Sequence, residues 1–145
     1  MTIIAWDGVT LAADKQSTNC GYGAKVTKIF RVPGGIVGFM GNGPHAMELL
    51  AWFKAGRVLD GFPKKSGDDF SDAVFISNDG LIQKYSGGGG PYPIILEDGF
   101  SAFGAGRDYA LAVMHLGKNA YEAVEVACAL DTTCGRGIDT LTLEL

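Results

Sequence analysis

Short strand-forming segments follow one another at the start of this chain without an intervening helix, and that order constrains the fold more than any other feature. Apolar, β-prone residues at 2–6 and 9–13 flank Asp7-Gly8, a strong signal for a two-residue hairpin turn. A glycine-containing turn and two further strands are predicted at 19–23, 25–32 and 36–41. The first 41 residues are therefore predicted to form two successive hairpins.

The rest of the chain keeps strands and helices in separate runs. A helix is predicted to begin near Pro44, because apolar residues follow it at the 3.6-residue period of one helical face. The later elements are predicted as strands at 73–77, 81–85, 92–96 and 100–103, helices at 107–116 and 120–130, and a last strand at 138–143. This order indicates an α+β fold, with two antiparallel sheets stacked face to face and helices outside. The length of 145 residues predicts one domain over 1–145.

Composition excludes several classes of protein. The 22 glycines are roughly twice the average share of about 7%, but they show no Gly-X-Y period, which excludes collagen. A net charge of −4 gives no support for binding nucleic acid or an anionic membrane. The chain has no apolar run of the roughly 18 residues needed to span a membrane, and its start lacks the pattern of a signal peptide. Three cysteines without a CxxC pair and two distant histidines predict a cytoplasmic protein with reduced thiols and no metal site or cofactor.

Thr2 is the first candidate for chemistry. If Met1 is removed, the α-amine of Thr2 is exposed, and its unperturbed pKa of about 8 leaves part of it neutral at pH 7. That amine can accept the proton of the hydroxyl on the same residue, so one residue supplies both nucleophile and base. Taken alone, the pattern equally fits an ordinary strand threonine.

Charged residues are predicted to gather near Thr2. The first hairpin folds Asp14 back beside Thr2, although a carboxylate at a strand end is commonly a turn cap. A lysine beside that carboxylate stays charged and lowers the pKa of the threonine hydroxyl. Lys25 and Lys28 differ by three positions and therefore point to opposite faces of a strand, so only one of them can face the site. The backbone N–H of Gly41, just before the predicted helix, can hold an oxyanion.

These segments, in this order, resemble the proteasome β-subunit and HslV-like family of N-terminal nucleophile (Ntn) hydrolases. The matching segments cover nearly the whole chain and lie at 2–5, 12–18, 25–29, 38–41, 102–110 and 131–135. The resemblance implies a four-layer αββα sandwich with a shortened helical layer. It also implies the site residues and their roles: Thr2 as nucleophile, Asp14 and Lys28 as its charged neighbours, Gly41 as oxyanion donor and Asp131 as support for the amine.

The resemblance further implies a threonine-type endopeptidase that acts on peptides or unfolded proteins once Met1 is removed. A homo-oligomer and an ATP-driven unfoldase as partner are implied in the same way. The lysine of the family is followed by an aliphatic residue, which favours Lys28-Ile29, although Val26 after Lys25 keeps the other lysine open.

The chain departs from the family pattern in several places, among them Ile3 after Thr2, a shorter first hairpin, a short connector at 56–71, and two positions near the predicted site. Ala105 stands where the family has the serine of a glycine-serine-glycine turn, and Cys134 stands where it has a small hydroxyl residue. These departures keep two alternatives open: a weakly active or inactive proteasome-like scaffold or binding protein, and an Ntn amidase that acts on small amides. Among the other residues, His45 is predicted on the surface of the first helical turn, and Cys134 as a packed small residue. The glycine run at 87–90 is predicted as a flexible turn.

Overall fold

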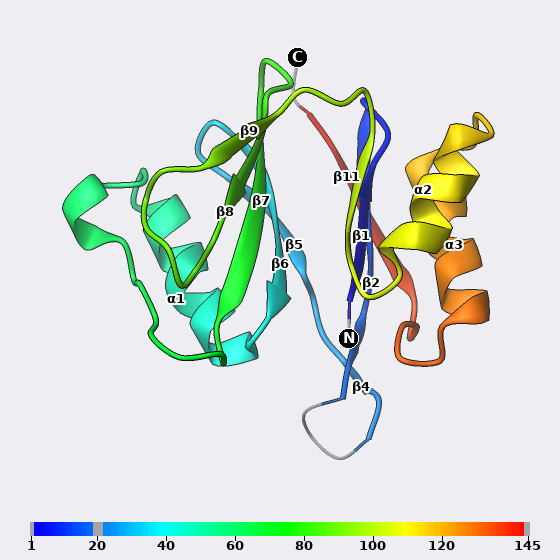
Figure 1. The fold of residues 1–145 in the computed structure, drawn as a ribbon, viewed down its shortest axis with the longest axis horizontal. Coiled ribbons are helices and arrows are strands. Elements are labelled where there is room, and N and C mark those ends of the chain that lie inside the picture. Colours follow the sequence, from blue (N-terminus) through cyan, green and yellow to red (C-terminus); the bar gives the residue numbers. More distant parts are fainter. Residues whose placement is uncertain (1, 19–21, 144–145) are drawn as a thin grey trace.

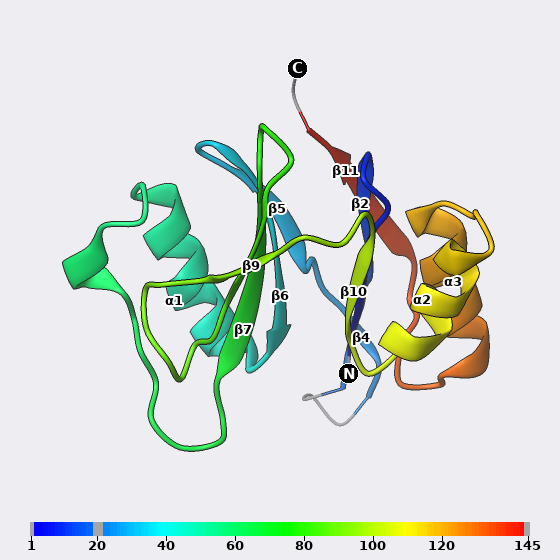
Figure 2. The same cartoon turned by 45° about the horizontal axis from the view of Figure 1, so that its top comes forward.

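A computed structural model describes residues 2–18 and 22–143 of the chain. Two antiparallel sheets face each other between layers of helix (Figure 1). Helix α1 (Gly43–Lys54) covers the outer face of one sheet, and helices α2 (Arg107–His115) and α3 (Ala120–Leu130) cover the other. Figure 2 shows α2 and α3 side by side on their sheet. The predicted α+β sandwich of four layers is confirmed.

The first sheet has the strand order β10-β1-β2-β11, and its strands are β1 (Ile3–Trp6), β2 (Thr10–Asp14), β10 (Ser101–Gly104) and β11 (Ile138–Thr142). The carboxylate of Asp7 closes the β1–β2 turn by accepting hydrogen bonds from the backbone N–H groups of Val9 and Thr10, at 2.9 and 2.7 Å. Ile4 pairs with Ala13, so the end of β2 returns to the start of β1. The first predicted hairpin is therefore present, with its open end at Thr2.

The second sheet has the strand order β5-β6-β7-β8-β9. Its strands are β5 (Ile29–Val32), β6 (Gly35–Gly41), β7 (Ser71–Ser77), β8 (Ile82–Tyr85) and β9 (Ile94–Leu96). The two strands predicted on either side of Glu97-Asp98-Gly99 do not pair with each other, because β9 lies in this sheet and β10 in the first. This segment carries the chain from one sheet to the other.

The predicted strand at 25–32 is interrupted in the structure. Its first residue belongs to β4 (Ala24–Lys25), which pairs with β3 (Gln16–Ser17) in a small ribbon, and strand geometry resumes only at Ile29 in β5. A short 3₁₀ helix (Leu59–Gly61) interrupts the connector after α1. Part of the turn predicted at 19–23, and Met1, lie outside the described residues.

Three apolar clusters hold the layers together. One lies between the two sheets, a second joins the first sheet to α2 and α3, and a third joins the second sheet to α1. Alanines dominate the second cluster, whereas aromatic rings dominate the third, where Trp52 packs edge-on against Phe53 and Tyr85. Trp6 and Trp52 are both buried core residues. Within the described ranges, no helix combines the length and the hydropathy that a membrane-spanning helix needs.

Gly38 of β6 lies where side chains of the first sheet pack tightly against the second. A Cβ atom at this position would lie 2.9 Å from Cδ1 of Ile4 on β1 and 3.2 Å from Cγ2 of Ile29 on β5. Gly38→Val is expected to lower the free energy of unfolding by about 1–3 kcal/mol, because the added methyl groups overpack the space between the sheets. Urea denaturation measures this change. The matched control is Gly99→Val, at an exposed position with open space around it, and equal midpoints for the two variants would contradict the expectation.

Candidate active site

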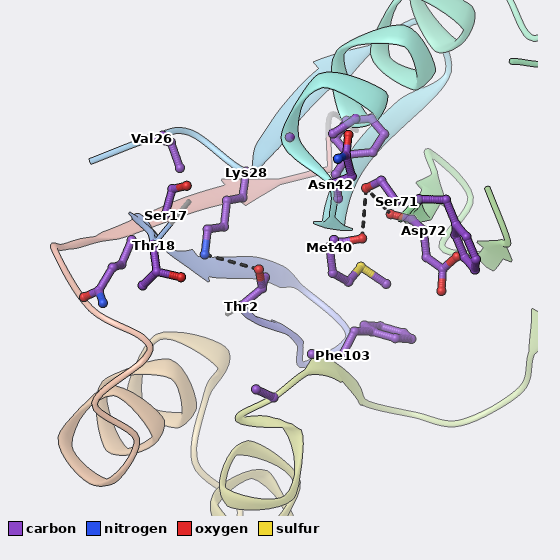
Figure 3. A pocket seen from close by; sticks show the side chains of 18 of the residues that line it. Thr2, Ser17, Thr18, Val26, Lys28, Met40, Asn42, Ser71, Asp72 and Phe103 are labelled. Carbon is purple, nitrogen blue, oxygen red and sulfur yellow. Dashed lines mark hydrogen bonds between the residues drawn. The ribbon is translucent and has the colours of Figure 1, made fainter. Parts of the chain in front are cut away.

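Thr2 lies immediately before β1, in the wall of a pocket of about 1220 Å³. The pocket takes residues from both sheets, including Phe103 and Ala105 from the β10–α2 segment and Met40 and Asn42 from the β6–α1 segment. Figure 3 shows Thr2 between Lys28 on one side and the side chains of Met40 and Phe103 on the other. The hydroxyl of Thr2 is thus placed beside a cation and an open volume.

A buried ion pair supports Thr2. Asp14 is fully buried at the end of β2, and its Oδ1 atom accepts a hydrogen bond from Nζ of Lys28 at 2.9 Å. Nζ of Lys28 also lies 3.3 Å from Oγ1 of Thr2. Of the five predicted site residues, Thr2 and Asp14 are therefore both in contact with Lys28, which lies between them. Lys25 is exposed on β4, so the lysine beside Thr2 is Lys28.

Backbone N–H groups complete the coordination of Asp14. Its Oδ1 atom also accepts a hydrogen bond from the N–H of Ile3 at 3.1 Å, and its Oδ2 atom accepts from Gly135 at 3.0 Å and from Gln16 at 3.3 Å. A carboxylate held by several such donors keeps one orientation. The contact with Gly135 joins the α3–β11 turn to the site, and sequence periodicity gives no signal for it.

Lys28 brings a positive charge close to Oγ1 of Thr2. The side chain of Lys28 is only 8% exposed, so little water screens its charge from Oγ1 of Thr2. A cation at this distance favours the alkoxide form of the hydroxyl and any negative charge that develops on an attacking oxygen. Asp14 holds the ammonium group in place.

Gly41 ends β6 and lines the same pocket as Thr2. Its φ angle is +115°, and a Cβ atom here would lie 2.4 Å from the carbonyl oxygen of Phe70, so only glycine fits. Helix α1 starts directly afterwards, with Asn42 as its N-cap. The positive end of the helix dipole therefore points to this part of the pocket.

The turn at 104–106 packs against the backbone of Thr2. Gly104 has a φ angle of +97°, and a Cβ atom there would lie 2.1 Å from the carbonyl oxygen of Thr2. The N–H of Gly106 donates a long hydrogen bond of 3.5 Å to the same oxygen. Ala105, between these two glycines, lines the pocket. It contributes a methyl group at the position where the glycine-serine-glycine turn of the family that the sequence resembles has a hydroxyl.

Asp131 lies at the C-terminal end of α3. Its Oδ1 atom accepts hydrogen bonds from the hydroxyl and the backbone N–H of Thr133, at 2.6 and 2.9 Å, and these bonds lower the pKa of Asp131. Its segment reaches the site through Gly135, whose N–H bonds to Asp14. The carboxylate of Asp131 bonds to Thr133 and is not among the residues that line the pocket, so the described residues connect it to Thr2 only through the backbone of 131–135.

The cysteines of the α3 end are packed. Cys134 is buried, as predicted, and Cys128 is partly buried on α3. Burial raises the pKa of the Cys128 thiol to about 12 and that of the Cys134 thiol to about 11, and the charge of Asp14 adds to both shifts. Thiols with such pKa values are poor nucleophiles at neutral pH.

His45 corrects a sequence prediction. It was expected on the surface of the first turn of α1, but its side chain is fully buried. Nδ1 of the ring lies 2.9 Å from the backbone N of Ser71, and Nε2 lies 2.6 Å from the carbonyl oxygen of Pro63. The segment between these two residues covers the helix start, a tertiary contact that helical periodicity cannot predict.

Solved structures share this fold. HslV from Trypanosoma brucei matches with a TM-score of 0.70 and 19% identity over 99% of both chains. BPH from Thiobacillus denitrificans matches in complex with epoxomicin, with a TM-score of 0.70, 14% identity and 99% coverage of both chains. BPH alone matches with a TM-score of 0.66 and 16% identity over 99% of this chain and 98% of the other. No family model and no curated protein matches the chain. The chain therefore has the Ntn-hydrolase fold of HslV, as the sequence resemblance implies.

Asp14→Asn tests the buried ion pair. The substitution removes the buried carboxylate that neutralises the Lys28 ammonium, and we expect it to lower the free energy of unfolding by about 3–5 kcal/mol in urea denaturation. The control Asp139→Asn removes the more exposed partner of Lys15, with an expected cost of about 0.2–1 kcal/mol. The double variant Asp14→Asn/Lys28→Met is expected to recover part of the loss, because no uncompensated charge remains. Equal costs for Asp14→Asn and Asp139→Asn would contradict the proposed role of burial.

Alkylation by iodoacetamide tests the packed thiols. Because the thiolate is the reactive form, a pKa of about 11 or 12 leaves few thiolates at pH 8, whereas unfolded thiols ionise near pH 8.5. At pH 8, Cys128 and Cys134 are expected to react roughly a hundredfold more slowly in the folded than in the urea-unfolded protein. The folded-state rate should rise as the pH approaches 11. Mass spectrometry of the digested protein measures the labelling rate of each cysteine-containing peptide. Rapid labelling of Cys134 in the folded protein at pH 8 would contradict the packed state.

Proposed function

We propose that the chain is an N-terminal threonine hydrolase, an HslV-like and proteasome-like threonine peptidase that cleaves peptide bonds. The observation that carries this proposal is the position of Lys28 Nζ, 3.3 Å from Oγ1 of Thr2 and 2.9 Å from Oδ1 of buried Asp14. The hydroxyl also faces a pocket, and the fold is that of HslV. Burying two charges costs free energy, so a buried ion pair beside a threonine with a purely structural role would be unexpected.

The proposed reaction begins with hydrolysis of the Met1–Thr2 peptide bond, which frees the α-amine of Thr2. Oγ1 of Thr2 then attacks the carbonyl carbon of the substrate, and its proton passes to the α-amine, directly or through water. Lys28 stabilises the negative charge on the attacking oxygen, while the N–H of Gly41 is proposed to bind the oxyanion of the tetrahedral intermediate. Asp131 is proposed to support the amine.

The second half of the reaction returns the enzyme to its starting state. The intermediate collapses, the C–N bond of the substrate breaks, and the ammonium group of Thr2 gives its proton to the leaving amine. Water then attacks the ester on Oγ1 of Thr2 while the α-amine accepts a proton from that water. The ester C–O bond breaks, the ammonium group returns the proton to Oγ1, and the carboxylic acid is released. Each step uses residues of this chain and water.

The size of the pocket favours peptides over small amides. At about 1220 Å³ it exceeds the roughly 300–1,000 Å³ of typical small-ligand pockets. It extends from Thr2 to the β7 strand, where Ser71 and Asp72 line it. A small amide would fill little of this volume, whereas an extended peptide can occupy it.

We further propose that the protein is a cytoplasmic homo-oligomer. Large apolar side chains are exposed close together in the chain at and just before the edge strand β9, namely Tyr92, Ile94 and Ile95, at 76%, 66% and 45%. Large apolar groups that gather at a surface mark contacts with other chains. An ATP-driven unfoldase as partner rests on the family resemblance alone.

A second candidate, a proteasome-like scaffold without turnover, is favoured by one observation. Ala105 brings a methyl group to the turn against Thr2, and the hydroxyl that would help to place the amine and the water is missing. A scaffold predicts that Thr2→Ala leaves the cellular role of the protein unchanged, whereas the hydrolase predicts its loss.

The chemistry of Thr2 is tested by mass spectrometry. The intact protein made in cells is expected to lack Met1, and epoxomicin, the compound present in the BPH complex, is expected to add to the peptide that begins with Thr2. Thr2→Ala is expected to form no adduct. A mature chain that begins at Thr2 and still gives no adduct would overturn the proposed nucleophile.

Turnover of fluorogenic peptides tests the choice of lysine. Lys28→Met is expected to lower kcat by roughly 10²–10³, the usual loss when one preorganised electrostatic group is removed. Lys25→Met is the matched control, because Lys25 is exposed on β4 and away from Thr2, and its kcat is expected to equal that of the parent. Equal losses in the two variants would contradict the role of Lys28.

A further inference from the structure

His45 is a buried polar side chain that the proposed reaction does not use. It occupies the first turn of α1, where its backbone N–H donates to the Asn42 N-cap at 2.8 Å. Its ring contacts two backbone groups at opposite ends of one segment, the N–H of Ser71 and the carbonyl of Pro63. A backbone N–H can only donate and a carbonyl can only accept, so Nδ1 accepts and Nε2 carries the proton. The imidazole is therefore neutral and in one tautomer.

The segment between Pro63 and Ser71 forms part of the pocket wall. Asp68, Asp69 and Phe70 line the pocket within it. Figure 2 shows this segment passing beside the first turn of α1 before it enters β7. Because His45 bonds to both ends of the segment, one side chain fixes where this wall begins and where it ends.

The same segment contacts the proposed oxyanion donor. The carbonyl oxygen of Phe70 accepts a hydrogen bond from the N–H of Asn42 at 3.2 Å, and it lies against Gly41, where a Cβ atom would be 2.4 Å away. The hydroxyl of Ser71 donates to the carbonyl of Met40 at 2.9 Å, as Figure 3 shows. The backbone of 40–42 is thus held by residues that His45 holds in turn.

The glycine run at 87–90 encloses the imidazole. A Cβ atom on Gly87 would lie 1.9 Å from the carbonyl oxygen of Ser71 and 2.5 Å from Cε1 of His45, so no larger residue fits. Gly87 also accepts a hydrogen bond from the N–H of Lys65 at 2.9 Å and donates one to Oδ1 of Asp72 at 3.2 Å. The glycine run was predicted as a flexible turn, but at Gly87 its backbone packs closely against His45, whose side chain is fully buried.

We infer that His45 is a positioning residue, which clamps segment 63–71 against Gly41 and so sets the geometry of the oxyanion donor and of the pocket wall. The catalytic part of this inference rests on the proposed function. The clamp itself is a property of the folded chain and is measurable without substrate. Substitutions can remove the acceptor atom or the donor atom of His45 one at a time, so the two hydrogen bonds can be tested separately.

Three variants separate the two bonds. His45→Asn keeps an acceptor near the position of Nδ1 for the N–H of Ser71, His45→Gln keeps a donor near the position of Nε2 for the carbonyl of Pro63, and His45→Phe keeps only a ring. Amide hydrogen exchange, resolved by NMR, is expected to quicken roughly tenfold to hundredfold at Ser71 and Asn42 in the Gln and Phe variants. The Asn variant is expected to exchange close to the parent rate. His115→Gln is the control, because His115 is the other histidine and is exposed on α2.

Kinetics of peptide cleavage give the second readout. In the Gln and Phe variants kcat is expected to fall roughly tenfold to hundredfold, since displacement of a catalytic group by about 1 Å costs up to about 10²-fold. The Asn variant is expected to retain most of kcat, a rescue that general loss of stability does not explain. Unchanged exchange at Ser71 and Asn42 in the Phe variant overturns the clamp. An unchanged kcat in an active enzyme overturns the positioning role, whereas an inactive parent contradicts the proposed function and leaves the exchange data to decide the clamp.

Discussion

The ion pair between Asp14 and Lys28 is the interaction on which the rest of the site depends. Both charges are removed from water, which costs free energy. This desolvation cost is offset because Asp14 also accepts hydrogen bonds from the backbone N–H groups of Ile3 and Gly135. These donors come from the start of β1 and from the turn before β11, so one carboxylate joins three segments that are distant in sequence. The threonine at the open end of the first hairpin is held beside a cation as a result. The whole N-terminal region is organised around this single carboxylate.

Close approach of backbone to backbone is the second constraint. Gly104 lies against the carbonyl of Thr2, and Gly41 lies against the carbonyl of Phe70, both at distances that no side chain tolerates. Such contacts fix main-chain groups without relying on flexible side chains, and the N–H groups near a reacting atom must be fixed if they are to stabilise charge. At these two positions glycine is required because two backbone segments lie in close contact, and not because the chain must be flexible.

Much of the architecture was predictable from the sequence, because strand alternation, the Asp7-Gly8 turn and helical periodicity are local signals. The return of Asp14 to the start of β1, where it accepts a hydrogen bond from the N–H of Ile3, was also predictable, since a tight hairpin fixes which residues meet at its open end. The choice of Lys28 over Lys25 was not predictable from alternation, because the strand breaks between them and the period of two no longer applies. The burial of His45 and the contact of Gly135 with Asp14 were missed for a related reason: both depend on segments that fold over the site from elsewhere in the chain.

The Asp14–Lys28 pair also crosses the boundary between the two halves of the sandwich. Asp14 ends a strand of the first sheet, and the backbone carbonyl of Lys28 accepts a hydrogen bond from Phe39 in the second. An apolar cluster also lies between the sheets, and apolar side chains resist sliding only weakly, whereas an ion pair tolerates little displacement. A slip by one residue, about 3.3 Å, would separate the ammonium from both Asp14 and Thr2. The site is therefore assembled only in a chain whose two halves have both folded and docked in register, and in a partly folded chain Thr2 lacks the cation beside its hydroxyl.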